Sequence, residues 1–232
     1  TARHDLGHVR DYANLSADLA AFVAGERARM DAAGRDGPLV AVGLSQGAHV
    51  ALRAGAEHGM PVDAYALLVP MIGIPGGRAG RVFVDLLAEN GAGATYLPGT
   101  VPWERRKRFT RLVGRGNICQ PDPALANLRR ALMEVDPDLR IEVPSAGWVS
   151  ATFASIDVLD RIAPQVAAPV LMVTAGRDRV VRTGAAAEMC TRLRDCRRLH
   201  LPDAPHCMVE GDRRRSGPVM ARVVGFLGRA GR

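Results

Sequence analysis

The sequence has few aromatic residues, almost no lysine, few cysteines and no long apolar run. Aromatics make up 4% of the chain and are not interleaved with basic residues, which argues against a single-strand nucleic-acid binder. Cys119, Cys190, Cys196 and Cys207 lack C-x-x-C spacing, so neither a zinc site nor a disulfide framework is indicated. We expect free thiols, although Cys190 and Cys196 can come close where a helix turns back into a strand. No apolar run approaches the length of a membrane span.

Nearly all of the positive charge is arginine, with Lys107 the single lysine, and the net charge is +7. The basic residues are spread along the chain, so we interpret most of them as solvated surface and expect no nucleic-acid partner. The N-terminus lacks the basic and then apolar pattern of a secretion signal, which favours a cytoplasmic protein. The basic stretch Trp103–Leu112 is interpreted as a solvated helix, with transient contact to an anionic membrane surface as the alternative.

The most informative stretch is LVAVGLSQGAHVALRAGAEHG, residues 39–59. A short apolar run leads into Gly43-Leu44-Ser45-Gln46-Gly47, and a helix-forming segment follows. Strand, sharp turn and helix are the context of a G-x-S-x-G nucleophile elbow, whose strain lifts the serine hydroxyl above the sheet. We expect both glycines because a turn this tight leaves no room for a Cβ. The helix N-terminus favours an oxyanion, with the backbone N–H of Gln46 as one donor.

The remaining chain predicts an α/β fold with a parallel sheet. Short apolar runs indicate buried strands at 64–69 and 169–174, and a last strand is predicted at 197–201. Helical spacing of Tyr12, Leu15, Leu19, Phe22 and Val23 predicts a helix over 11–31 with these residues on a core, and further helices are predicted at 184–194 and at the C-terminus.

Glycine and proline are frequent in the middle of the chain, where the pattern predicts helical pieces at 80–89, 103–113, 123–134 and 150–162. We interpret this segment as a helical cap inserted over the site. The predicted division is 1–72 for the core with the elbow, 73–163 for the cap, and 164–232 for the core with the acid and histidine loops.

Polar residues follow three of the predicted strands, in the chain order Ser45, Asp178, His206. The carboxyl ends of parallel strands meet at one edge of the sheet, so these residues converge there. A serine hydroxyl needs a base within hydrogen-bond reach, and the base needs a group that orients it. His206 is the histidine that lies on a loop just after a strand. Asp178 has the better position for the acid, and Asp203 stays open as an alternative.

These motifs resemble the α/β-hydrolases of the bacterial lysophospholipase and monoacylglycerol lipase-like group, of the serine aminopeptidase type. The similarity covers nearly the whole chain and is most specific in residues 175–181 and 203–210. It implies that Ser45 is the nucleophile, that His206 is the base and then the acid, and that Asp178 orients His206. The implied reaction hydrolyses a carboxylic ester of a monoacyl lipid through an acyl-enzyme, without a metal or organic cofactor. Trp148 is a candidate for lining an acyl pocket or for packing the cap onto the sheet.

Two features depart from this group. Many relatives have histidine where Leu44 precedes the serine. Relatives also begin with several more strands, and a loop after one of these supplies the second oxyanion donor, so we expect this sequence to be the C-terminal part of a complete hydrolase. The alternatives are a peptidase, thioesterase or acyltransferase of the same fold, or a non-catalytic or inactive truncated protein.

Overall fold

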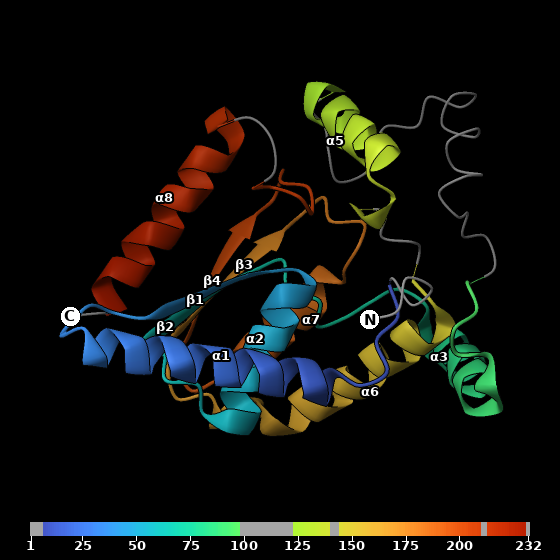
Figure 1. The fold of residues 1–232 in the computed structure, drawn as a ribbon, viewed down its shortest axis with the longest axis horizontal. Coiled ribbons are helices and arrows are strands. Elements are labelled where there is room, and N and C mark those ends of the chain that lie inside the picture. The colour runs from blue at the N-terminus through green and yellow to red at the C-terminus, as the bar shows by residue number, and fades with distance from the viewer. Residues whose placement is uncertain (1–6, 98–122, 140–143, 210–212, 231–232) are drawn as a thin grey trace. The chain divides into compact units, whose positions relative to one another are not determined.

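The computed structural model describes residues 7–97, 123–139, 144–209 and 213–230, which Figure 1 draws as a coloured ribbon. These residues separate into two compact units. We call them the sheet unit, with the described residues of 11–75, 155–209 and 213–230, and the helical unit, with those of 7–10 and 76–154. The helix predicted at 103–113 lies outside the described residues. The division into 1–72, 73–163 and 164–232 stays a prediction.

Four parallel strands, in the order β1-β2-β3-β4, form the centre of the sheet unit. Their bounds are Val40–Leu44, Ala64–Leu68, Val170–Ala175 and Cys196–Leu201. Every residue of β2 and β3 is buried, which explains why both strands appear in the sequence as apolar runs, with Thr174 as the exception. The predicted α/β fold with a parallel sheet is confirmed, and the strands lie within one residue of their predicted positions.

Helices cover both faces of this sheet, as Figure 1 shows. The helices α1 (Tyr12–Ala32), α2 (Gln46–His58), α7 (Thr183–Arg192) and the end of α6 (Ala146–Ile162) bury apolar side chains on one face. On the other face lies α8 (Arg213–Ala230). The expectation that Phe22 of α1 faces a core is wrong, because its side chain is 62% exposed while Tyr12 and Val23 are buried.

The helical unit contains α3 (Gly77–Leu87), a π-helical turn η2 (Ala88–Ala92), α5 (Pro123–Val135), a 3₁₀ turn η3 (Pro137–Leu139) and the first half of α6. The helix predicted at 150–162 begins earlier, at Ala146. The hydroxyl of Ser145 accepts a hydrogen bond from the N–H of Trp148 at 3.1 Å, the bond that an N-cap serine makes with the third helical residue. That hydroxyl also pairs with Nδ1 of His8 at 2.7 Å.

A hydrogen-bonded polar group lies within the core of the sheet unit, around His49 of α2. Its Nδ1 donates to the carbonyl of Met71 (2.9 Å), and its Nε2 is 2.6 Å from Oγ of Ser155 on α6. Arg53 donates to the same hydroxyl at 2.8 Å and pairs with Glu57 at 2.8 Å. Arg53 is only 6% exposed, so the interpretation of the arginines as solvated surface does not hold for this residue.

Burial lowers the pKa of His49 to about 4; the Met71 carbonyl raises it, the charge of Arg53 lowers it further and that of Glu57 raises it. At neutral pH the ring is therefore uncharged and carries one proton. A carbonyl only accepts hydrogen bonds, so the proton is on Nδ1, facing Met71. Nε2 is then an acceptor, and the hydroxyl of Ser155 donates to it. Each polar group in this part of the core thus has a partner.

The prediction of free thiols is wrong for three of the cysteines. Cys190, near the end of α7, forms a disulfide with Cys196, the first residue of β4, and their Cα atoms are 5.4 Å apart. That separation lies in the usual range for a disulfide. Cys207 is also disulfide-bonded.

We predict that His49 makes the protein less stable in mild acid. In the unfolded chain this histidine binds a proton near its ordinary pKa of 6.5, whereas the folded protein resists protonation until about pH 4. Above pH 6.5 the ring is neutral in both states and does not affect the free energy of unfolding. As the pH falls from 6.5 to 4, the free energy of unfolding should decrease by about 3 kcal/mol. Urea unfolding at several pH values measures this loss. His49→Gln should flatten the slope, while His58→Gln at the end of the same helix should keep it; equal slopes in both variants would contradict the assignment.

Candidate active site

The turn between β1 and α2 holds Ser45 in an unusual backbone conformation, with φ 52° and ψ −115°. A non-glycine residue seldom adopts a positive φ, and the cost is of the order of 1–3 kcal/mol. Hydrogen bonds fix the turn from both sides. The N–H of Ser45 donates to the carbonyl of Leu68 in β2 (2.9 Å), and its carbonyl accepts from the N–H of Met71 (3.1 Å).

The two glycines of the elbow differ in their surroundings. A Cβ at Gly43 would lie 2.5 Å from Cα of Ala48, so the backbones of β1 and α2 touch there. A Cβ at Gly47 would meet nothing within 4 Å in the part of the chain that the structure describes. The expectation that a close backbone approach requires both glycines is therefore correct for Gly43 and wrong for Gly47.

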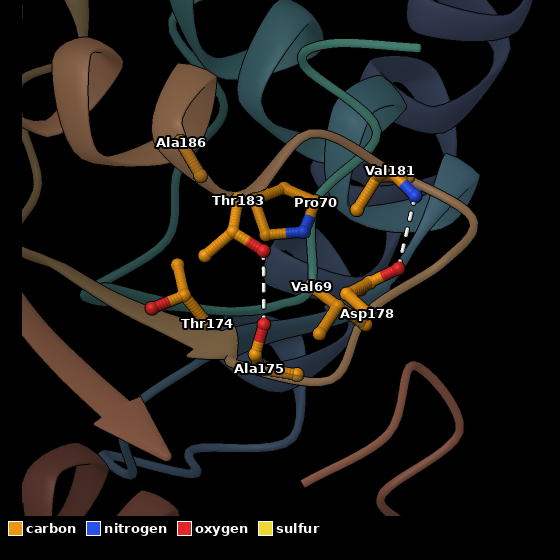
Figure 2. Close-up of a pocket in the computed structure, with 8 residues that line it drawn as sticks. All are labelled: Val69, Pro70, Thr174, Ala175, Asp178, Val181, Thr183 and Ala186. Carbon is orange, nitrogen blue, oxygen red and sulfur yellow. Dashed lines mark hydrogen bonds between the residues drawn. The ribbon is translucent and has the colours of Figure 1, made fainter. Parts of the chain in front are cut away.

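The acid loop follows β3, and Asp178 lies three residues after the strand ends. Oδ1 of Asp178 accepts hydrogen bonds from the N–H groups of Val180 (2.8 Å) and Val181 (2.9 Å). Figure 2 shows the Val181 bond, together with the bond from the hydroxyl of Thr183 to the carbonyl of Ala175, which holds the far end of the loop. The eight residues labelled in Figure 2 line a hollow that has no room for a water molecule. The carboxylate is thus held in place by its own loop.

The histidine loop follows β4 and lies directly against the acid loop. A Cβ at Gly176 would be 2.2 Å from the carbonyl oxygen of Pro202, so glycine is required where the loops meet. Backbone bonds join them, from Gly176 to Leu201 (2.8 Å) and from Arg177 to Ala204 (3.0 Å). These contacts set the position of His206 relative to Asp178.

Ser45, His206 and Asp178 form one continuous chain of hydrogen bonds at the carboxyl end of the sheet. Nδ1 of His206 is 2.7 Å from Oδ2 of Asp178, and its Nε2 is 2.9 Å from Oγ of Ser45. Only 5% of the His206 side chain and none of the Asp178 side chain is exposed. A carboxylate accepts and does not donate, so Nδ1 carries the proton of the neutral ring and Nε2 is free to accept from the serine hydroxyl.

The environment keeps Asp178 ionised. Burial raises the pKa of its carboxyl group, but hydrogen bonds from His206 and from the N–H groups of Val181 and Val180 outweigh burial and hold the pKa below its ordinary value. An ionised Asp178 stabilises positive charge on His206, as is needed if the imidazole takes up a proton.

The other predicted site residues lie in different surroundings. Asp203 is on the surface, with a side chain 83% exposed and paired with Arg177 at 2.9 Å, so it is not the partner of His206. Gln46 is the first residue of α2, where backbone N–H groups have no acceptor within the helix. Trp148 belongs to the helical unit, and its part in substrate binding stays a prediction. Among the described residues, no cluster of three or more His, Cys, Asp or Glu side chains is arranged to hold a metal ion.

Sequence reasoning missed the residues that support the elbow. Val69 directly follows β2 with φ 40°, a rare conformation for a β-branched residue. It donates to Val173 of β3 (2.8 Å), and two residues later Met71 bonds to Ser45. Nothing in the sequence signals this conformation, because a residue before proline favours an extended backbone and not a positive φ.

A parallel sheet with a serine, a histidine and a carboxylate joined at its carboxyl edge defines the α/β-hydrolase class. The family described as serine aminopeptidase, S33 matches residues 3–213, and the chain belongs to this family. No curated protein sequence matches the chain significantly. Within the described residues, no helix is both long enough and apolar enough to cross a membrane.

Several solved structures share this fold. A monoacylglycerol lipase from Paleococcus ferrophilus has a TM-score of 0.67 and 14% identity, with 97% of this chain and 77% of that one covered. A soluble variant of monoglyceride lipase from Saccharomyces cerevisiae, in complex with a substrate analog, has a TM-score of 0.69 and 16% identity, with 96% of this chain and 71% of that one covered. A thermostable carboxyl esterase from Bacillus coagulans, in complex with glycerol, has a TM-score of 0.67 and 15% identity, with 97% of this chain and 74% of that one covered.

The two elbow glycines should respond differently to the same substitution. Gly43→Ala places a Cβ against the backbone of Ala48 and should lower the free energy of unfolding by about 3 kcal/mol or more, because backbone must move to accept it. Gly47→Ala meets no described atom and should leave stability unchanged or raise it by up to about 1 kcal/mol through helix propensity. Thermal and urea unfolding of both variants measure the difference; equal losses would contradict the close contact at Gly43.

The strain at Ser45 can be measured directly. Ser45→Gly and Ser45→Ala both remove the hydroxyl, but only glycine adopts a φ of 52° without a Cβ penalty. We expect the glycine variant to be more stable than the alanine variant by about 1–2 kcal/mol. Urea unfolding of the pair gives the difference, and an alanine variant as stable as the glycine variant would show that the elbow is unstrained.

Proposed function

We propose that the protein is a serine hydrolase that cleaves carboxylic esters of monoacyl lipids through an acyl-enzyme. The observation that carries the proposal is the unbroken hydrogen-bond chain from Ser45 through His206 to a buried, ionised Asp178. A neutral serine hydroxyl is a weak nucleophile, and this arrangement supplies both the base that activates it and the carboxylate that orients the base.

The geometry supports a two-step reaction. Oγ of Ser45 attacks the ester carbonyl while its proton passes to Nε2 of His206, and the backbone N–H of Gln46 donates to the developing oxyanion. The tetrahedral intermediate then collapses, and His206 returns the proton to the departing alcohol. Water next attacks the acyl-enzyme with His206 as the base, releasing the carboxylic acid and restoring the serine.

Support for a monoacyl lipid comes from the names of structurally similar proteins. Two of them are lipases of monoglycerides, and a third is a carboxyl esterase with bound glycerol. These proteins are 14–16% identical to this chain, so the substrate class is our inference from the shared fold. A glycerol or glycerophospho group is the alcohol that we expect to leave in the first step.

The family description favours a second candidate, an aminopeptidase that uses the same serine. Both reactions pass through an acyl-enzyme, and only the leaving group differs. Parallel assays with a monoacylglycerol, a lysophospholipid and an amino-acid aryl amide distinguish them. We expect turnover of the esters only, and faster turnover of the amide would replace the lipase proposal with the peptidase one.

The role of Asp178 has a matched control in Asp203. Asp178→Asn should lower kcat for ester hydrolysis by roughly 10³- to 10⁴-fold, because an amide neither fixes the productive tautomer of His206 nor stabilises its charge. Asp203→Asn removes an equal charge from an exposed site and should leave kcat within about twofold. Initial rates on a soluble aryl ester measure both effects.

Labelling of Ser45 by a serine-reactive phosphonate, lost in Ser45→Ala, provides an independent readout of the nucleophile. A folded protein that neither labels nor turns over any ester would favour the non-catalytic alternative.

A further inference from the structure

A second hollow of the sheet unit lies between the edge strand β4 and helix α8. Its volume is about 330 Å³, at the lower end of the range for small-molecule sites. The strand residues that line it, Leu171, Arg197 and Leu199, are in the first four positions of β3 and β4. The triad instead follows the carboxyl ends of the strands, so none of these strand residues belongs to the triad site.

Apolar residues and arginines both line this cleft. Its floor is apolar, from Leu171 and Leu199 on the sheet and Ala221 and Phe226 on α8. Three guanidinium groups also line it, from Arg197, Arg222 and Arg229. No acidic residue is among the lining residues.

These three arginines differ from others in the sheet unit. Arg27, Arg53, Arg177 and Arg192 each pair with an aspartate or glutamate. Among the residues that the structure describes, Arg197, Arg222 and Arg229 have no such partner. Three like charges around one cleft repel one another, and an anion bound between them removes that repulsion.

We propose that this cleft binds a single-chain anionic amphiphile, with its acid group on the arginines and its alkyl chain on the apolar floor. A guanidinium pairs with a carboxylate through two parallel hydrogen bonds, so a carboxylate head group is matched to these arginines. Removing the alkyl chain from water over Leu171, Leu199 and Phe226 adds a hydrophobic contribution. The arrangement of charge and apolar surface is independent of the triad. If the proposed function is correct, fatty acids are also a product of the enzyme.

The chain offers matched controls for both parts of the cleft. Arg197 pairs in register with Leu171, whereas Arg198 pairs with Met172, which packs in the core on the opposite face of the sheet. Arg197→Gln and Arg198→Gln therefore remove the same charge from opposite faces. On α8, Gly225 lines the cleft and a Cβ there would meet only the tip of Arg229, while Gly228 has nothing within 4 Å. Gly225→Leu should fill the cleft, and Gly228→Leu should not.

Titration calorimetry with monomeric decanoate tests the proposal. Arg197→Gln should weaken binding by roughly five- to tenfold, as expected for one partly exposed charge pair, and Gly225→Leu by at least about tenfold, because its side chain occupies the site. Arg198→Gln and Gly228→Leu should bind like the unaltered protein. Decanol and decyltrimethylammonium should bind at least about tenfold more weakly, since neither presents an anion to the arginines.

Three results would overturn the proposal. Equal decanoate affinity in the lining variants and their controls would place any binding elsewhere, including at the triad. Decyltrimethylammonium binding as tightly as decanoate would show that the arginines do not select the ligand. Cosedimentation with phosphatidylglycerol vesicles forms the second arm of the test. If Arg197→Gln and Arg198→Gln weaken vesicle binding equally while decanoate does not bind, the arginines act as surface charge and not as a site.

Discussion

The contact between the backbones of β1 and α2 is the constraint on which the candidate site depends. Because Gly43 lies against Ala48, the chain must turn sharply between the strand and the helix. Ser45 therefore takes a backbone conformation that costs a serine conformational energy. The same turn puts the serine hydroxyl within 2.9 Å of His206. A wider turn would relieve the strain, but it would also move the hydroxyl away from its base. Strain and reactivity therefore have a common origin here.

That strain persists because the neighbouring strand and the core hold the turn in place. Met71 bonds to the carbonyl of Ser45, and its own carbonyl accepts from the buried ring of His49. That ring packs edge-to-face with the ring of Tyr12 of α1 at a centroid distance of 5.0 Å, and its second nitrogen bonds to Ser155 of α6. Three helices thus support the loop that restrains the nucleophile. A neutral histidine suits this position because it donates on one side and accepts on the other.

Most of the sheet unit could be predicted from the sequence because its physical causes are local. Strands buried on both faces must be apolar throughout, and a G-x-S-x-G turn has a fixed context. Other features depend on the packing of the folded chain. The sequence indicated that Cys190 and Cys196 can come close, but not that they form a disulfide. The exposure of Phe22 depends on how α1 rotates against its neighbours. Gly47 was expected to lack room for a Cβ, as Gly43 does. The two glycines differ because Gly43 lies near the end of a strand and Gly47 at the start of a helix. The convergence of Ser45, Asp178 and His206 was predictable because parallel strands share one direction.

The role of each arginine also depends on its surroundings in the folded protein. From the sequence, a positive charge spread along the chain indicates solvated surface, and Arg177 with its exposed partner fits that interpretation. Arg53 does not, since it is buried between Glu57 and Ser155 and its fixed, planar guanidinium donates to both. A lysine there would present a point charge on a flexible stem and could not reproduce the two fixed directions. The guanidiniums around the cleft beside α8 meet no carboxylate among the described residues, so the same side chain neutralises a charge in the core and leaves one unpaired at the surface. What separates these roles is the presence of a carboxylate within reach, which depends on the fold and not on the composition.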